Sequence, residues 1–335
     1  PFPLYRLFFC PANRVWGQCR THRSRKCGLY QTVKACITEY FCSKIENTSY
    51  PPHCDITVRG IFCEKKGGET AYQLKKKHVI SLSGGKDSTA LALRMREEGW
   101  PMDILLFVDT GLEFPQMYEH IDKLEQYLQF PITRLKPPHS FEYLFYEYAP
   151  PRKNPALEGL SGLSWPGPQC RWCTARLKTR IIDRYLRELK KEFEVVQYIG
   201  IAADEQERVR EFQYPLVEWE MAEADCLAYC RARGFDWGGL YDLFRRVSCW
   251  CCPLQPLSEL RTLRKHFPEL WEKLRYMDAH TWRQFRADYS VEQLEQRFAL
   301  EEERAVQGLP LKGRDFYAAL KNRLGENAGE TGRSL

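Results

Sequence analysis

A short loop rich in glycine and hydroxyl side chains is the first pattern in this chain that could do chemistry. Its six residues are Ser83, Gly84, Gly85, Lys86, Asp87 and Ser88. An apolar run typical of a strand precedes the loop, and a helical pattern follows it. Backbone N–H groups at a helix start bind anions, and glycines let a phosphate approach the main chain. With an ammonium and two hydroxyls as further donors, the pattern predicts a phosphate site; an ordinary Gly-Gly turn is the alternative.

Two pairs of cysteines form the second pattern. Two residues separate Cys170 from Cys173, and Cys249 and Cys252 repeat that spacing. Two such pairs supply four thiolates to one centre, which is either Zn²⁺ or an iron–sulfur cluster. Cysteines packed in the core as small hydrophobes are the alternative. Cys251 is a spare, either a ligand in place of Cys170 or a reactive thiol.

Polar residues also follow the second buried strand that the sequence predicts. This strand is the apolar run Met102–Val108, and Asp109, Thr110 and Gly111 come directly after it. The carboxyl ends of parallel strands meet at one edge of a sheet, so we expect these residues beside the phosphate loop. A carboxylate there can hold Mg²⁺ or orient a ribose, whereas the alternative is a common Asp-Gly turn.

The fourth predicted strand ends in a charged segment. Gly200 lies at its end, and Asp204, Glu205 and Arg208 follow. If this strand joins the same parallel sheet, these side chains reach the same edge as the phosphate loop. They are therefore candidates for contact with nucleotide and metal, and a solvated run of surface charge is the alternative.

A basic helix is predicted after the first cysteine pair. Arg176, Lys178 and Arg180 lie in its opening turns, where cations oppose the helix dipole. This arrangement predicts an anion nearby, unless the three cations form only a solvated face.

Strands and helices alternate through the middle of the chain, which predicts an α/β fold with a doubly wound parallel sheet and a C-terminal helical extension. The predicted strands are His78–Leu82, Met102–Val108, Ile132–Leu135, Glu194–Ile201 and Tyr214–Val217. The predicted helices are Lys86–Glu98, Phe114–Phe130, Thr174–Lys191 and Met221–Arg233, with a long loop over 136–169. After Pro253 the predicted helices are Leu257–His266, Glu269–Tyr276, Ala279–Tyr289, Val291–Arg304 and Gly313–Leu324. Cys226 and Cys230 lie one helical turn apart, which predicts that they are core residues.

The composition is typical of a globular protein. The chain has 335 residues, of which 44% are hydrophobic and 28% are charged. Its 50 Lys and Arg exceed its 44 Asp and Glu, but the basic excess lies in the first 77 residues. No apolar run approaches the length of a membrane span, and no secretory signal is recognisable. We therefore expect a cytoplasmic protein with no membrane partner.

Residues 1–70 form a basic, cysteine-rich segment without a clear period. The first methionine is Met95 and the chain begins with Pro1, which favours the interpretation that this segment lies upstream of the true start. A metal-binding accessory module and a disulfide-bonded segment are the alternatives. The remainder is expected to form a nucleotide-binding domain with the cysteine centre over 71–255 and a helical region over 256–335.

Four segments together resemble the phosphoadenosine-phosphosulfate (PAPS) reductase family of the adenine nucleotide alpha-hydrolase superfamily, over about residues 75–255. They are SGGKDS from Ser83, VDTGLEFP from Val108, CRWCTARLK from Cys170 and GIAADEQER from Gly200. The resemblance implies a nucleotide-binding domain of the same fold, with ATP, APS or PAPS as the nucleotide and Mg²⁺ as the metal. It assigns the loop and the strand ends to the nucleotide, and it directs Arg176 and Lys178 to the phosphates.

The same resemblance implies catalytic roles for Lys86, Asp87 and Asp109. In one respect the chain departs from the family pattern: Ala202 stands where the family has an arginine. Part of the phosphate or sulfate contact is then lost or is supplied from elsewhere.

The resemblance also implies a [4Fe–4S] cluster. Iron–sulfur members of the family use an adjacent Cys-Cys pair before a basic helix and a later C-x-x-C. Cys173, Cys249 and Cys252 match those places, while Cys170 replaces the first cysteine of the adjacent pair. This departure leaves Zn²⁺ open as the alternative metal.

For the reaction, the leading hypothesis is a PP-loop ATP pyrophosphatase that cleaves ATP to AMP and pyrophosphate and adenylates an acceptor for sulfur transfer. This is similar to the sulfur-transfer subunits of DNA phosphorothioation systems. The implied partners are an adenine nucleotide, a nucleic-acid acceptor such as DNA or tRNA, and a sulfur donor such as a cysteine desulfurase. One alternative is an APS or PAPS reductase, although no cysteine follows Cys252 to serve as the tail nucleophile. The other is a non-catalytic nucleotide-binding subunit of a modification or defence complex.

Overall fold

The computed structural model describes residues 61–66, 69–152, 154–247 and 249–327. The chain divides into two compact units, Pro1–Val58 and Arg59–Leu335, and every described residue belongs to the second. Most of the basic segment predicted over 1–70 therefore lies outside the described residues. The proposed division at residues 70 and 255 stays a prediction.

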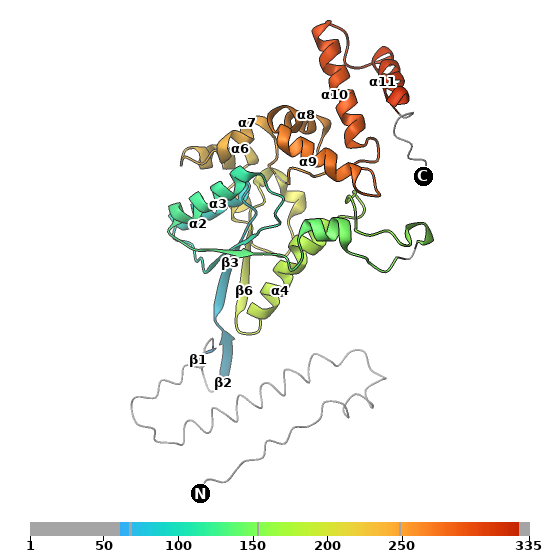
Figure 1. Ribbon diagram of the computed structural model, residues 1–335. Coiled ribbons are helices and arrows are strands. Elements are labelled where there is room, and N and C mark those ends of the chain that lie inside the picture. The colour runs from blue at the N-terminus through green and yellow to red at the C-terminus, as the bar shows by residue number, and fades with distance from the viewer. Residues whose placement is uncertain (1–60, 67–68, 153, 248, 328–335) are drawn as a thin grey trace. The chain divides into compact units, whose positions relative to one another are not determined.

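The described unit alternates strands and helices in its first half and is helical in its second half (Figure 1). Its strands are β1 Ile61–Lys66, β2 Glu69–Leu74, β3 Lys76–Leu82, β4 Ile104–Val108, β5 Ile132–Leu135 and β6 Glu194–Ile199. Its helices are α2 Lys86–Glu97, α3 Pro115–Leu128, α4 Arg180–Leu189, α5 Pro215–Glu218, α6 Glu223–Arg231, α7 Leu240–Leu243, α8 Leu257–His266, α9 Pro268–Ala279, α10 Val291–Val306 and α11 Arg314–Asn327. Two π-helical turns occur, at Tyr143–Glu147 and Thr174–Thr179.

The central sheet has four parallel strands in the order β5-β4-β3-β6. Because β3 lies between β4 and β6, the chain winds from the middle of the sheet to one side and then crosses to the other. The predicted doubly wound α/β fold is confirmed. All four strands run in the same direction, so their carboxyl ends meet at one edge, where the phosphate loop follows β3.

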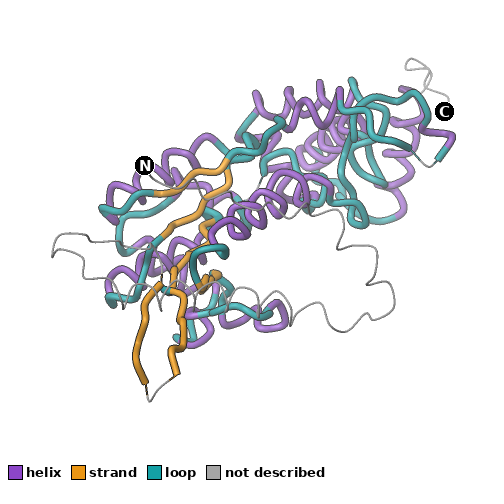
Figure 2. The backbone as a smooth tube through the Cα atoms, turned by 90° about the horizontal axis from the view of Figure 1, so that it is seen from below, coloured by secondary structure: helices purple, strands orange, loops and turns teal. Residues whose placement is uncertain are grey.

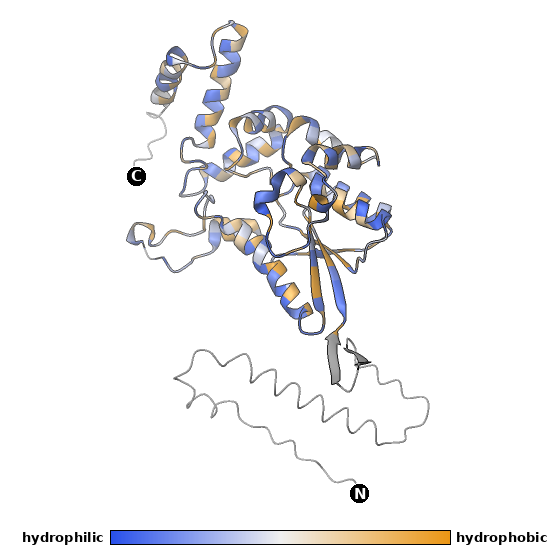
Figure 3. Ribbon diagram, turned by 180° about the vertical axis from the view of Figure 1, so that it is seen from behind, coloured by the Kyte–Doolittle hydropathy of each residue, from blue (hydrophilic) through white to orange (hydrophobic). Residues whose placement is uncertain are grey.

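Alternate residues of the strands enter two different cores. Ile80 and Leu105 contribute to the large core, together with residues of α2 and α3. Val79 and Ile104 face the other way and join a smaller core that includes Leu186 of α4. Figure 2 shows helices on both sides of the strands, and Figure 3 shows apolar and polar residues mixed along α4. The period-two alternation of strands thus explains how one sheet binds helices on both faces.

The predicted strand Tyr214–Val217 is wrong. Residues Pro215–Glu218 form the short helix α5 instead. Gln213 does begin a parallel pairing, because its backbone N–H donates to Gln197 at 2.9 Å and its carbonyl accepts from Ile199 at 3.0 Å. The ladder stops there because Pro215 has no N–H to donate and its fixed φ suits the first turn of a helix.

The predicted helix Ala279–Tyr289 is also wrong, because α9 ends at Ala279 and turns follow. The segment after α9 is held by tertiary contacts to Ser164. The Ser164 hydroxyl accepts from the Thr281 hydroxyl at 2.7 Å and from the Arg283 backbone N–H at 3.1 Å. These contacts outweigh the helical pattern. The other C-terminal helices form as α8, α9, α10 and α11.

Among the described residues, no helix has both the length and the apolar character needed to cross a bilayer.

Candidate nucleotide site and cysteine centre

The phosphate loop is held in shape by its own hydroxyl groups. The Ser83 and Ser88 hydroxyl oxygens lie 3.0 Å apart, and the Ser88 hydroxyl donates to the Gly85 carbonyl at 3.1 Å. Gly84 has a φ of +82°, in the left-handed region that favours glycine. Gly85 caps α2 without a side chain, so the first turn of the helix presents backbone N–H groups to an anion.

Lys86 is buried within an ion-pair network at this loop. Its ammonium lies 2.9 Å from a Glu223 carboxylate oxygen and 3.4 Å from an Asp87 oxygen. Burial works to lower the pKa of Lys86, but the hydrogen bond to Glu223 and the charges of Asp87 and Glu223 outweigh it, so the pKa is raised. The lysine therefore stays charged and its position is fixed.

Two aromatic residues far along the chain clamp the loop backbone. The Trp237 indole N–H donates to the Gly84 carbonyl at 2.7 Å, and the Tyr241 hydroxyl accepts from the Lys86 backbone N–H at 2.9 Å. Trp237 in turn stacks on His120 of α3, with ring centroids 4.4 Å apart. Sequence reasoning missed Glu223, Trp237 and Tyr241, because no local pattern indicates a contact across so much chain.

Carboxylates gather beside Lys86. Burial raises the pKa of Asp87, and the nearby charges of Glu223 and Glu205 add to this while Lys86 opposes it. One Asp87 oxygen, Oδ1, is buried without a hydrogen-bond partner. Mg²⁺ in proteins is bound by oxygen ligands such as carboxylates. The residues beside Lys86 are therefore of the chemical type that Mg²⁺ requires.

The segment after β6 lies against the phosphate loop, as the sequence predicts. A Cβ on Gly200 would lie 2.8 Å from the backbone N and Cα of Ser88, so only glycine allows this approach. Glu205 and Arg208 form an ion pair beside Asp87. Asp204 accepts from the Glu223 backbone N–H at 3.0 Å, which places it at the start of α6.

The segment after β4 forms a separate buried network. The Thr110 hydroxyl donates to the buried Glu113 carboxylate at 2.8 Å. The Tyr118 hydroxyl lies 3.0 Å from Asp109 and 3.2 Å from Glu113, and so links the two acids. Asp109 also accepts from the exposed Gly111 backbone N–H at 3.0 Å. Sequence reasoning missed Glu113, although it lies within the VDTGLEFP segment.

The basic helix opens as the π-helical turn Thr174–Thr179. Such turns are rare in proteins overall, but those that occur are often at functional sites. Lys178 donates to Glu113 at 3.2 Å. Burial works to lower the pKa of Lys178, but its interactions with Cys249 and Glu113 raise it overall. The Arg176 guanidinium instead stacks over the Tyr148 ring at 4.6 Å.

The predicted metal ligands differ in exposure. Cys170 is exposed, whereas Cys173, Cys249 and Cys252 are partly buried. Cys251 is buried within the large core. The buried positions of Cys226 and Cys230 agree with their prediction as core residues.

Three of these thiols act on one another. Burial raises the pKa of Cys249 to about 12, Lys178 opposes this, and the neighbouring Cys252 and Cys173 groups add to it. Burial likewise raises the pKa of Cys252, with Cys173 among the contributing charges. The raised pKa values of Cys249 and Cys252 keep these two thiols protonated at neutral pH. A bound metal would remove these protons, because a coordinating thiol is deprotonated.

Within the described parts of the chain, no three His, Cys, Asp or Glu side chains are arranged about a single point that could hold a metal ion. Cys173, Cys249 and Cys252 offer the kind of ligand that zinc and iron–sulfur centres use, but without a coordination geometry in this structure.

The loop at the end of β3, Gly200 and both cysteine pairs all lie within the part of the chain that matches one known domain. The chain belongs to the phosphoadenosine phosphosulfate reductase domain family, whose model matches residues 77–255. The predicted membership is confirmed, and with it a nucleotide-binding enzyme family of sulfur chemistry.

Two curated relatives are uncharacterized proteins of Methanocaldococcus jannaschii. One is 26% identical over 220 residues, which are 61% of this chain and 42% of the relative. The other is 25% identical over 205 residues, which are 58% of this chain and 45% of the relative. The chain thus spans less than half the length of these relatives.

Two solved structures are also similar. The phosphate complex of PAPS reductase from Candida auris shares 19% identity, covering 52% of this chain and 81% of that one, with a TM-score of 0.39. The U34-tRNA thiolase NcsA from Methanococcus maripaludis with its [4Fe-4S] cluster shares 17% identity, covering 83% and 82%, with a TM-score of 0.31.

Proposed function

We propose that this protein cleaves ATP between its α- and β-phosphates and uses the adenylate to activate an acceptor for sulfur transfer. The observation that carries the proposal is the phosphate loop, where a charged Lys86 is fixed beside a helix start. Such a site stabilises a polyphosphate, and its lysine can neutralise a leaving pyrophosphate. Family membership supports the sulfur chemistry.

In the proposed reaction, an acceptor oxygen attacks the α-phosphorus of ATP. The bond between that phosphorus and the bridging oxygen breaks, and pyrophosphate leaves with the electron pair. Lys86 and the backbone N–H groups of the loop would stabilise the charge that develops on pyrophosphate. Asp87 and Asp109 would supply oxygen ligands to Mg²⁺, which would help to neutralise the charge of the phosphates.

The adenylated oxygen is then a good leaving group. The terminal sulfur of a persulfide on a donor protein such as a cysteine desulfurase would attack the acceptor atom and release AMP. A thiol reductant would then cleave the S–S bond and leave the sulfur on the acceptor. We place the metal centre at Cys173, Cys249 and Cys252, with Cys170 as the fourth predicted ligand. A [4Fe–4S] cluster bound there would supply a site for sulfide, whereas Zn²⁺ would only join the two chain segments.

Product analysis tests this proposal. The full chain is incubated with ATP labelled at the α-phosphate, Mg²⁺, a sulfur donor, and either bulk tRNA or DNA as acceptor. We expect labelled AMP and an equal amount of pyrophosphate, both dependent on the acceptor. ADP as the product would contradict the proposal. Sulfite formed from APS or PAPS would favour the reductase instead, and ATP binding without turnover would favour a non-catalytic subunit.

A further inference from the structure

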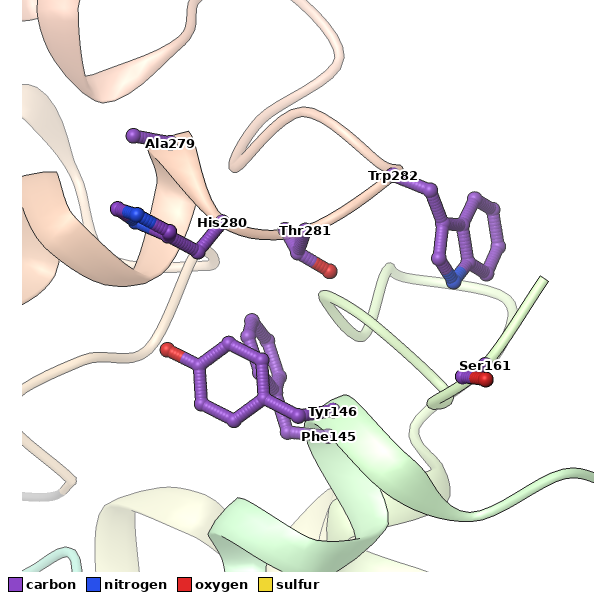
Figure 4. Close-up of a pocket in the computed structure, with 7 residues that line it drawn as sticks. All are labelled: Phe145, Tyr146, Ser161, Ala279, His280, Thr281 and Trp282. Atoms are coloured by element: carbon purple, nitrogen blue, oxygen red, sulfur yellow. The ribbon is translucent and has the colours of Figure 1, made fainter.

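A cavity of about 440 Å³ lies between the π-helical turn Tyr143–Glu147 and the segment that follows α9 (Figure 4). This volume is in the range of about 300–1,000 Å³ that is usual for small-molecule sites. Its main lining residues are Phe145, Tyr146, Ser161, His280, Thr281 and Trp282. Figure 4 shows Trp282 across the opening from the two rings of the π-helical turn, with the Thr281 hydroxyl directed between them.

The wall of this cavity is built into the fold. Gly162 has a φ of +71°, and a Cβ there would lie 1.9 Å from the Phe145 carbonyl oxygen. Ser164 also lies in the left-handed region, with a φ of 55°. Such conformations cost free energy in a non-glycine residue and persist only where surrounding contacts hold them. The hydrogen bonds of Ser164 to Thr281 and Arg283 are those contacts.

One polar group in the cavity wall lacks a partner. The Tyr146 hydroxyl is buried and makes no hydrogen bond. Its oxygen has almost no accessible surface, so Tyr146 presents its ring to the cavity and its hydroxyl lies behind the wall.

The aromatic surface is accompanied by cationic side chains. The Arg152 guanidinium lies 5.0 Å from the Trp282 ring centroid and donates to the Gly162 carbonyl at 2.6 Å. Arg283 is exposed on the same segment as Trp282. Aromatic rings stack nucleobases without regard to sequence, and arginines neutralise the phosphates that connect them.

One lysine contacts both the start of the π-helical turn and the second cysteine segment. The Lys273 ammonium is 5.4 Å from the centroid of the Trp250 ring, which lies between Cys249 and Cys251 in the sequence. The same ammonium is 3.9 Å from Glu142, the residue before the π-helical turn. Lys273 thus joins the cavity's helical wall to the second cysteine segment.

We propose that this cavity binds one unstacked base of a nucleic-acid acceptor. The identity of the occupant as an acceptor rests on the proposed function, whereas binding of a base does not depend on turnover. A base inside a duplex cannot reach such a cavity, so the substrate is a single-stranded or flipped-out nucleotide.

Oligonucleotides containing 2-aminopurine test this proposal with the full chain, without ATP and at one fixed salt concentration. Stacking in the cavity should quench the fluorescence of the probe. Trp282→Ala should weaken binding about tenfold or more, from the free energy of base stacking. Trp282→Phe should retain most of the affinity. Tyr146→Phe, which removes only the buried hydroxyl and keeps the ring, should retain most of the affinity, whereas Tyr146→Ala should weaken binding about tenfold.

Tyr127→Ala provides a matched control, because this tyrosine is exposed on α3 and is 50% accessible; it should bind like wild type. The proposal is overturned if Trp282→Ala also binds like wild type, or if no oligonucleotide is quenched. It is also overturned if free 2-aminopurine riboside binds as tightly as the oligonucleotide, which would indicate a small-molecule site. Quenching without any pyrophosphate formation would sink the proposed function and leave the base site standing.

Discussion

The phosphate loop and the cysteine centre differ in how far the fold alone completes them. At the loop, the Lys86 ammonium has two carboxylate partners, and Trp237 and Tyr241 hold the backbone. At the cysteine centre, burial keeps Cys249 and Cys252 protonated, and no finished metal geometry is present among the described residues. The loop is thus ordered by packing, whereas the proposed cysteine centre would take its final geometry only with a bound metal.

This difference follows from the chemistry of the two ligands. A phosphate is bound by N–H groups and ammonium ions that already carry the right charge in the empty protein. A thiol binds metal only after it loses a proton, and burial opposes that loss until the metal arrives. A substitution can therefore remove metal binding and leave nucleotide binding intact, or the reverse. The following predictions test the two sites separately.

Loss of a metal ligand should have the largest effect. We expect Cys249→Ser to abolish metal binding, because the thiolates are the ligands that would hold the metal. The affinity for ATP should stay as in wild type. Iron, zinc and acid-labile sulfide are measured on anaerobically purified protein. Four irons and four sulfides with a band near ~400 nm indicate the cluster, and one zinc without sulfide indicates a structural site. Cys226→Ala, at a core cysteine, is the matched control; loss of metal in both variants alike would contradict the assignment.

Removal of the loop cation should be the next largest effect. Lys86→Met keeps the length of the side chain but removes its charge, so pyrophosphate loses its main cation. We expect AMP formation to fall about 10²- to 10³-fold, as when one donor to a developing anion is removed, with metal content unchanged. Lys76→Ala is the control, at a lysine of β3 whose side chain is 57% exposed. An unchanged rate in Lys86→Met would refute this role.

A side chain at Gly200 should disturb the loop through packing. The new Cβ in Gly200→Ala would meet backbone atoms at 2.8 Å, and overpacking of this kind costs about 1–3 kcal/mol. Urea unfolding measures the loss of stability. Gly325→Ala is the control, because a Cβ there meets nothing within 4 Å, and alanine favours a helix. Equal stability of both variants would show that the contact between Gly200 and the Ser88 backbone has room for a side chain.

The smallest effect concerns His120 under the loop clamp. Burial lowers its pKa to about 3 from an ordinary 6.5, so the native state holds it neutral while the unfolded chain protonates it below pH 6.5. Its contribution to stability is thus present above pH 6.5 and is lost as the pH falls toward 3. Between pH 6 and pH 5 this loss is roughly 1 kcal/mol. In urea unfolding, the stability of His120→Gln should fall less between pH 6 and pH 5 than that of wild type. An equal fall in both proteins would contradict the role of His120.

The sequence predicts the parts of this molecule that depend on local pattern. The strand before Ser83, the helix after it and the buried run that forms β4 all follow from apolar period and turn residues. Family membership follows from four short segments. The structure also places Gly200 against the loop, where the motif had only indicated a nearby position.

Other parts depend on contacts that no local pattern contains. Glu223 contributes to the loop only because α6 packs beside α2, and nothing around it in the sequence indicates that. The pattern over 279–289 predicts a helix, but hydrogen bonds to Ser164, 117–119 residues away, hold this segment in another conformation. Pro215 was a readable signal against a fifth strand, since proline cannot donate to a ladder.

The clamp on the phosphate loop has a consequence for synthesis of the chain. Gly84 and Trp237 are 153 residues apart, and Lys86 and Tyr241 are 155 apart. At about 5–20 residues per second, a ribosome needs roughly 8–30 s to make that stretch. Contacts of such long range also form slowly, because the intervening chain must close first. During that interval a nascent chain carries the complete motif without its clamp, so these contacts can hold the loop only after Tyr241 has been made.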